Sequence, residues 1–232
     1  MQKFIYLFLA VFFYFLSACE QNHVAPDPTL IIEPVPHKIL GRDTIRSGNY
    51  AGLTIGSSAA ETYQDLKKVN SPTSINYLNL VSNIYTDLNQ LRDKLPLYHN
   101  MYFSNPEARH AGIQINFEAG KVKSIFTNEG KKLNKWPVGA TNVNSVQVND
   151  PVTIIFDKLV KIKAKPQYAK TFSEIMLLTK DPDKAYDNNM SQLPQWYFSY
   201  KLEGRKWDEV QLIFKAGKLG SINLTHFESP EK

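Results

Sequence analysis

The sequence predicts an α+β protein made of two tandem repeats, each a helical segment packed on a four-stranded antiparallel sheet. Two observations indicate the repeat. A hairpin-like stretch with an Ala-Gly-Lys turn occurs at 112–125 and again at 209–222, so that 97 residues separate Gly120 from Gly217. A helix-start pattern occurs at 53–58 and again near 146–151, an offset of about 93 residues. Two such units side by side are compatible with one continuous eight-stranded sheet.

The first repeat is assigned to residues 49–137. Ser58 and Glu61 have the spacing of a capping box, which predicts the start of a helix. Its apolar face follows at three-residue intervals (Tyr63, Leu66, Val69), and Ser71-Pro72 ends it. The stretch 75–91 fits both a helix and a strand, and the repeat favours a strand at its start. Further strands are expected at 98–103, 113–117 and 122–126.

The second repeat is assigned to residues 138–228. Asp150 is a good N-cap and Pro151 a good first helical residue. An apolar face follows at Val152, Ile155, Phe156, Leu159 and Ile162. Four strands are expected at 174–179, 195–202, 209–215 and 219–227, separated by turn residues. For both hairpins, a two-residue Ala-Gly loop and a three-residue loop with a glycine bulge remain open.

Residues 1–18 are interpreted as a signal peptide. Lys3 supplies the positive charge, and the apolar run 4–16 is too short for a membrane-spanning helix. Leu16-Ser17-Ala18-Cys19 resembles the lipobox of bacterial lipoproteins. That resemblance implies cleavage before Cys19 and attachment of a diacylglycerol to its thiol. The alternative is an ordinary secretory signal cut after Ala18. Cys19 is the single cysteine of the chain, so no disulfide framework is available and the lipoprotein interpretation is favoured.

Residues 19–48 are interpreted as a proline-rich tether. Pro26, Pro28, Pro34 and Pro36 favour an extended backbone, and some 20 residues at ~3 Å each would reach roughly 60 Å. The alternative is that 30–32 (Leu-Ile-Ile) docks as an edge strand.

Composition and net charge indicate which classes of partner the protein is suited to bind. The 232 residues carry a formal net charge of +5 and are 43% hydrophobic, which favours a packed core and does not indicate nucleic-acid binding. Lysines at 121–135 and 158–170 are read as solvated faces, with attraction of an acidic partner or of lipid headgroups as the alternative.

The sequence carries no recognisable catalytic or metal-binding motif, so neither an enzyme nor a cofactor is predicted. The five histidines lack the close spacing of a metal pair. Asp181, Asp183 and Asp187 resemble a calcium loop, but Ala185 stands at a ligand position and no glycine makes the bend, so capped turns are preferred. No phosphate loop, dinucleotide fingerprint or nucleophile elbow is present.

Aromatic residues on or near the expected strands are the candidates for partner binding. Trp196, Phe198 and Tyr200 alternate on one face of a strand, and Trp196 is expected in the core. Tyr197 lies on the other face, and Trp136 and Trp207 lie near strand ends. The candidate partner-binding residues are Tyr197, Trp207, Trp136 and Tyr102.

The doubled pattern of a helix and a four-stranded sheet, over roughly 50–227, resembles the β-lactamase-inhibitor-protein-like fold. The same unit in single copy resembles small outer-membrane assembly lipoproteins of Gram-negative bacteria. The first resemblance implies a protein-binding surface on the sheet face away from the helices. The present chain differs because no cysteine lies within its repeats.

These observations predict a lipoprotein of the cell envelope, anchored in the outer membrane through Cys19 and facing the periplasm or the cell surface. Its expected role is that of a non-catalytic module that binds a protein partner. The alternatives are a structural component of outer-membrane protein assembly and an enzyme with a site between the repeats.

Overall fold

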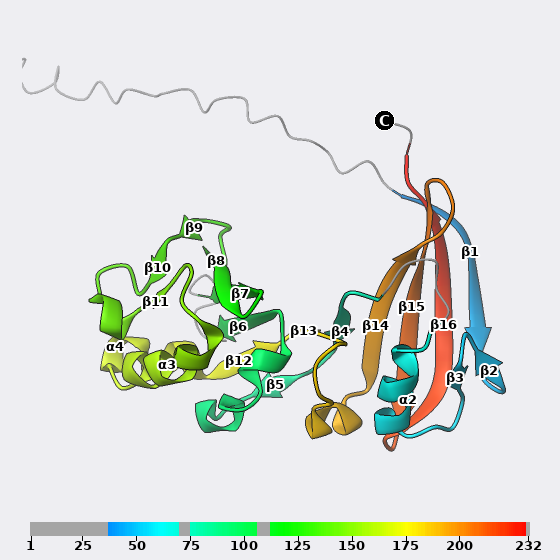
Figure 1. Ribbon diagram of the computed structural model, residues 1–232, viewed down its shortest axis with the longest axis horizontal. Helices are drawn as coiled ribbons and strands as arrows, with labels where there is room; N and C mark the ends of the chain where they lie inside the picture. The colour runs from blue at the N-terminus through cyan, green and yellow to red at the C-terminus, as the bar shows by residue number, and fades with distance from the viewer. Residues whose placement is uncertain (1–36, 70–74, 106–111, 231–232) are drawn as a thin grey trace, which may run out of the picture. The chain divides into compact units, whose positions relative to one another are not determined.

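The computed structural model describes residues 37–69, 75–105 and 112–230 (Figure 1). Residues 37–232 form one compact unit. The predictions for the signal peptide, for Cys19 and for a strand at 30–32 lie outside the described residues. In the described part, no helix is long and apolar enough to cross a membrane.

The fold is mostly β, with a few short helices. The first sheet has six antiparallel strands, in the order β1 (Lys38–Ile45), β16 (Lys218–Glu228), β15 (Lys206–Lys215), β14 (Gln195–Lys201), β4 (Leu78–Leu80) and β13 (Thr179–Lys180). The second sheet has the order β5 (Ile84–Tyr85), β12 (Glu174–Leu177), β6 (Asn100–Ser104), β7 (Ile113–Glu118), β8 (Lys121–Thr127) and β9 (Lys132–Leu133). Two small sheets pair β2 (Asn49–Tyr50) with β3 (Leu53–Thr54), and β10 (Lys135–Trp136) with β11 (Val146–Gln147).

The helices are short. They are α2 (Ala59–Leu66), α3 (Ile155–Lys163) and α4 (Pro166–Ala169), with 3₁₀ turns at 88–91, 95–97, 142–144, 152–154, 170–172 and 188–192. The capping box that starts α2 is confirmed, because Ser58 Oγ accepts from Glu61 N while the Glu61 carboxylate accepts from Ser58 N. Tyr63 and Leu66 are buried, as their spacing predicted.

The predicted N-cap role of Asp150 is wrong. Its carboxylate accepts from Gln147 N and from Lys158 Nζ, both at 2.7 Å, so it closes the preceding turn and pairs with a lysine. Pro151 has an extended conformation and precedes a 3₁₀ turn that leads into α3. The helix therefore begins later than the sequence pattern suggests.

The expected eight-stranded sheet is also wrong, because two segments cross between two separate sheets. β4 and β5 are the ends of one segment, and β12 and β13 are the ends of the other. The segments are antiparallel to each other, with Asn79 opposite Thr179 at one end and Ile84 opposite Met176 at the other. Between these ends Ser82 has a positive φ of 63°. This irregularity interrupts the ladder, so the segment leaves one sheet and enters the other.

Each sheet combines strands from both halves of the sequence. β4 comes from the first half and joins β14, β15 and β16 from the second, whereas β12 comes from the second half and joins β6, β7 and β8 from the first. The helices also contact strands of the other half: α2, from the first half, lies against β16, from the second (Figure 1). A helix with four strands is therefore present twice, but each set is assembled from both predicted repeats.

Equivalent backbone hydrogen bonds fix this exchange. Ahead of α2 they are Gly56 N to Leu219 O at 2.8 Å, Leu219 N to Ser57 O at 2.9 Å and Ala59 N to Gly217 O at 2.9 Å. Ahead of α3 they are Asn149 N to Val122 O at 2.8 Å, Val122 N to Asp150 O at 2.9 Å and Val152 N to Gly120 O at 2.9 Å. Each helix entrance is thus bonded to the hairpin of the other half.

Both hairpins have two-residue turns. Ala119 and Gly120 have φ of 48° and 74°, and Ala216 and Gly217 have φ of 49° and 72°. Two successive positive φ values are those of a type I′ turn, which matches the twist of the flanking strands. The register of each hairpin shifts next to the turn, leaving Lys123 and Gly220 as extra residues. The shared bulge matches the 97-residue offset.

Strand β1 lies within the residues assigned to the tether. It pairs with β16 from Lys38 opposite Glu228 to Ile45 opposite Ile222. Most of its side chains are exposed, so it shows little of the apolar alternation that marks a strand in a sequence. Its order comes instead from backbone pairing with the edge of β16.

Candidate functional site

The two faces of the first sheet differ in composition. On β14, Trp196 and Phe198 point into the core and are fully buried, which confirms the expectation for Trp196. Tyr197 and Ser199 alternate with them on the opposite, partly exposed face. We call this opposite face of the first sheet its open face.

A row of uncharged side chains crosses the open face of the first sheet. In register they are Asn79, Tyr197, Gln211, Asn223 and Thr44. Thr44 Oγ1 donates to Asn223 Oδ1 at 3.1 Å, and Asn223 Nδ2 donates to Gln211 Oε1 at 3.0 Å. The row therefore offers amides and hydroxyls in a fixed order.

A similar row lies on the open face of the second sheet. Asn100, Asn116 and Ser124 are in register, and Asn116 Nδ2 donates to Ser124 Oγ at 3.0 Å. Thr179 links the two rows, because it donates to Asn79 Oδ1 at 2.9 Å and accepts from Asn100 Nδ2 at 3.1 Å. Hydrogen bonds between side chains thus connect the two open faces.

A groove of about 580 Å³ opens beside Trp207. It is lined by Asn76, Tyr77, Ser199, Tyr200, Lys201, Trp207 and Ser229. Trp207 is opposite Phe227 in the ladder, and the two rings stack with centroids 4.2 Å apart and planes 9° apart. His37 meets the same indole nearly at a right angle.

The structure separates the four aromatic candidates. Tyr197 and Trp207 lie on the open face of the first sheet, and Tyr102 lies on that of the second, where its hydroxyl donates to Asn128 Oδ1 at 2.9 Å. Trp136 is only 7% exposed and packs among Phe103, Phe172 and Tyr168, so it offers little surface to a partner.

The amide row was not anticipated from the sequence. Its signal was present, because Asn79 and Gln211 each stand at the polar position of an alternating strand. Such alternation identifies an outward face but does not say that the faces of two sheets are joined.

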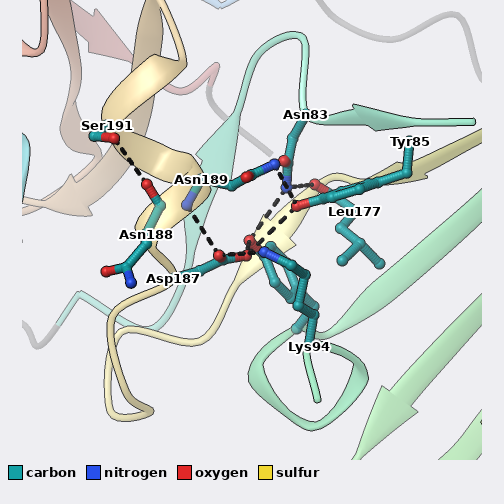
Figure 2. A network of polar contacts seen from close by, with 9 residues as sticks. Asn83, Tyr85, Lys94, Leu177, Asp187, Asn188, Asn189 and Ser191 are labelled. Atoms are coloured by element: carbon teal, nitrogen blue, oxygen red, sulfur yellow. Dashed lines mark hydrogen bonds and ion pairs between the residues drawn. The ribbon is translucent and has the colours of Figure 1, made fainter. Parts of the chain in front are cut away.

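A buried polar cluster lies where the two crossing segments meet (Figure 2). The side chain of Asp187 is 3% exposed and accepts from Lys94 Nζ at 2.5 Å, from Tyr98 OH at 2.8 Å and from Asn189 N at 3.1 Å. Figure 2 shows Tyr85 and Asn83 converging on the same place. Burial, followed by the charge of Asp187, raises the pKa of Tyr98, so its hydroxyl stays protonated as a donor.

Lys180 is a second buried charge close to this cluster. It is fully buried, and its Nζ donates to Tyr63 OH at 2.8 Å and to Asp181 O at 2.7 Å. Tyr63 OH in turn lies within bonding distance of the carbonyl oxygens of Asp181, Pro182 and Lys184. Burial lowers the pKa of Lys180 to about 8, against the favourable charges of Asp181 and Asp187.

A third polar group ties β1 to the first sheet. His226 Nδ1 lies 2.7 Å from Asp208 Oδ1, and its Nε2 lies 3.1 Å from Asp43 Oδ2 on β1. Tyr200 OH donates to Asp208 Oδ2 at 3.2 Å and is 2.6 Å from Tyr50 OH. Hydrogen bonds to the two carboxylates raise the pKa of His226, Asp208 being the larger cause.

These polar groups bond to one another and to the backbone. Among the described residues, no three His, Cys, Asp or Glu side chains come together as a metal site would require. The capped-turn interpretation of the acidic stretch is confirmed, since Asp181 Oδ1 accepts from Asp183 N and Asp187 Oδ1 accepts from Asn189 N. The open faces, with the Trp207 groove on the first of them, present exposed aromatic and uncharged polar side chains to a ligand.

Comparison of the chain with family models, with curated proteins and with solved structures finds no match in any of the three.

Proposed function

We propose that the protein is a lipid-anchored lipoprotein of a bacterial cell envelope that binds a protein partner through its open sheet faces. The observation that carries this proposal is the pair of uncharged rows that Thr179 joins, with Tyr197 inside the first row and Tyr102 on the same open face as the second. Interface centres are poor in charged residues and rich in tyrosine and tryptophan. Hydrogen bonds within the rows already hold these side chains in place, which lowers the cost of ordering them on binding.

The anchor is the second part of the proposal. A lipid on Cys19 would hold the chain at the outer membrane, on its periplasmic or its outer side, with the stretch after Cys19 as a spacer. Mass spectrometry of the mature protein tests this part. A mass increase equal to a diacylglycerol, lost in Cys19→Ala, is expected, and an unlipidated parent protein would refute the anchor.

Affinity purification tests the binding role. The tagged full chain, solubilised in mild detergent from its own cells, is expected to retain one partner protein. The double variant Tyr197→Ala/Gln211→Ala is expected to lose it, whereas Lys161→Ala, on the exposed side of α3, is expected to keep it. Retention by the double variant would contradict the proposed face, and recovery of integral barrel proteins would favour a role in outer-membrane assembly.

A further inference from the structure

We propose that the Trp207 groove binds a pyranose ring of a saccharide. This ligand class goes beyond the proposed protein partner, and the groove is separate from the amide row. The proposal rests on the aromatic walls, the hydrogen-bonding groups and the volume of the groove.

Aromatic rings supply the apolar part of the site. Trp207 and Tyr77 both line the groove, and Tyr77 is 39% exposed. Phe227 stacks on Trp207 and thereby fixes the plane of the indole. A pyranose has faces formed by C–H groups, which pack on flat aromatic surfaces and bury apolar area there.

Neutral polar groups supply the rest of the lining. Asn76 contributes an amide, and Ser199 and Ser229 contribute hydroxyls. Amides and hydroxyls both donate and accept, as the hydroxyls of a sugar require. A lipid chain would make no use of these polar groups, and a phosphate ligand would favour several cationic donors, whereas Lys201 is the one charged side chain among the lining residues that the structure describes.

The groove has the size and rigidity of a small-ligand site. Its volume of about 580 Å³ falls within the several hundred Å³ common for such sites. Ser199 and Lys201 stand on β14, Trp207 on β15, and both strands lie inside the six-stranded sheet. The hydroxyl of Tyr200 is bonded to Tyr50 and Asp208 on the other side of the sheet. The wall formed by β14 and β15 is therefore in place before any ligand arrives.

Calorimetric titration of the full chain in detergent tests the proposal with four probes. Three are neutral hexasaccharides, made of β-1,4-glucose, α-1,4-glucose and β-1,4-mannose. The fourth is a hexamer of α-1,4-galacturonate, whose carboxylates would meet Lys201. At least one probe is expected to bind, and its identity separates a neutral from an acidic ligand.

Variants then assign the binding to the groove. Trp207→Ala is expected to weaken it at least about tenfold, and Trp207→Phe is expected to retain part of the affinity. Phe126→Ala, which removes an aromatic ring from the open face of the second sheet, serves as the matched control and is expected to bind normally. Near-ultraviolet circular dichroism verifies that each variant is folded.

Fluorescence gives an independent readout on the parent protein. Trp196 and Trp136 are buried, so a change in emission on titration is expected to come from Trp207. Failure of all four probes to bind would overturn the proposal, as would binding that survives Trp207→Ala. Loss of the partner protein in Trp207→Ala, without saccharide binding by the parent, would assign the groove to the protein interface instead.

Discussion

The backbone N–H of Ala59, at the start of α2, donates to the carbonyl oxygen of Gly217, in the turn of the hairpin from the other half of the chain. In the equivalent bond, the backbone N–H of Val152, ahead of α3, donates to the carbonyl oxygen of Gly120, in the hairpin turn of the first half. Each half therefore supplies a helix entrance and a strand that the other half needs to complete its sheet.

This exchange predicts that the two halves cannot fold separately. Fragments 37–138 and 139–232 are each expected to be largely unfolded, because α2 and β4 would lose β14–β16, and α3 and β12 would lose β6–β8. Mixing the fragments is expected to restore the circular dichroism spectrum and a cooperative thermal transition. A well-dispersed NMR spectrum from either fragment alone would contradict the exchange.

Removal of the Asp187 carboxylate is predicted to be strongly destabilising. Asp187→Ala leaves Lys94 and Tyr98 without their shared acceptor, and breaking a buried ion pair in this way costs about 3–5 kcal/mol. Urea denaturation measures the loss in the free energy of unfolding. Asp183→Asn changes an exposed aspartate in the same loop and is expected to stay within about 0.5 kcal/mol of the parent.

The lowered pKa of Lys180 is expected to raise the free energy of unfolding at mildly alkaline pH. Its pKa falls from the ordinary lysine value of 10.5 to about 8 in the folded protein, so between these values the unfolded chain binds more protons. The contribution of Lys180 to the free energy of unfolding therefore rises as the pH increases through that window. Lys180→Met is expected to lose this rise between pH 8 and 9.5. An identical pH dependence in the two proteins would show that Lys180 is not the group responsible.

The ionisation of His226 is expected to give the opposite pH dependence, a loss of stability as the pH rises, and to affect only strand β1. Its pKa is raised in the folded state, so its stabilising contribution is complete below the ordinary value of 6.5 and is lost as the pH rises through the folded value. The groups facing it are Asp208, Asp43 and Tyr200, and Lys206 lines a small surface cavity together with His226 and Asp208. Hydrogen exchange of 38–45, corrected for intrinsic rates, is expected to accelerate as the pH rises above 6.5.

The internal control for that experiment is the β7–β8 hairpin, whose protection is expected to stay constant over the same range. His226→Gln is expected to abolish the pH dependence in β1. Persistence of the dependence in this variant would mean that another group holds the strand.

Local features of the fold were predictable from the sequence, and long-range partners were not. The capping box of Ser58 and the hairpin around Gly120 follow from interactions within a few residues, which a sequence pattern encodes directly. The packing of α2 on the hairpin of the second half, and of α3 on the hairpin of the first half, depends on which of the two hairpins each helix contacts. Two similar hairpins offer similar surfaces, so periodicity cannot distinguish the two connections.

The burial of polar side chains could not be predicted either, because it also depends on contacts between distant parts of the chain. Lys180 and Asp187 stand among turn residues, where charged side chains are usually solvated, yet both are buried where the two crossing segments meet. The open-face position of Tyr197 followed from strand alternation, whereas Trp207 lay outside the expected strand and Trp136 is enclosed by aromatic residues from distant parts of the chain. Burial of an aromatic residue near a strand end depends on packing that the local pattern does not contain.

Position-specific photocrosslinking tests the proposed binding role most directly. A benzophenone side chain is placed at Tyr197, at Tyr102 and, as a control, at Lys161 on the exposed side of α3, and the full chain is irradiated in its own cells. One protein is expected to be crosslinked from positions 197 and 102, and none from position 161. Crosslinks to that protein from 161 alone, or none from either open face, would contradict the proposed binding role.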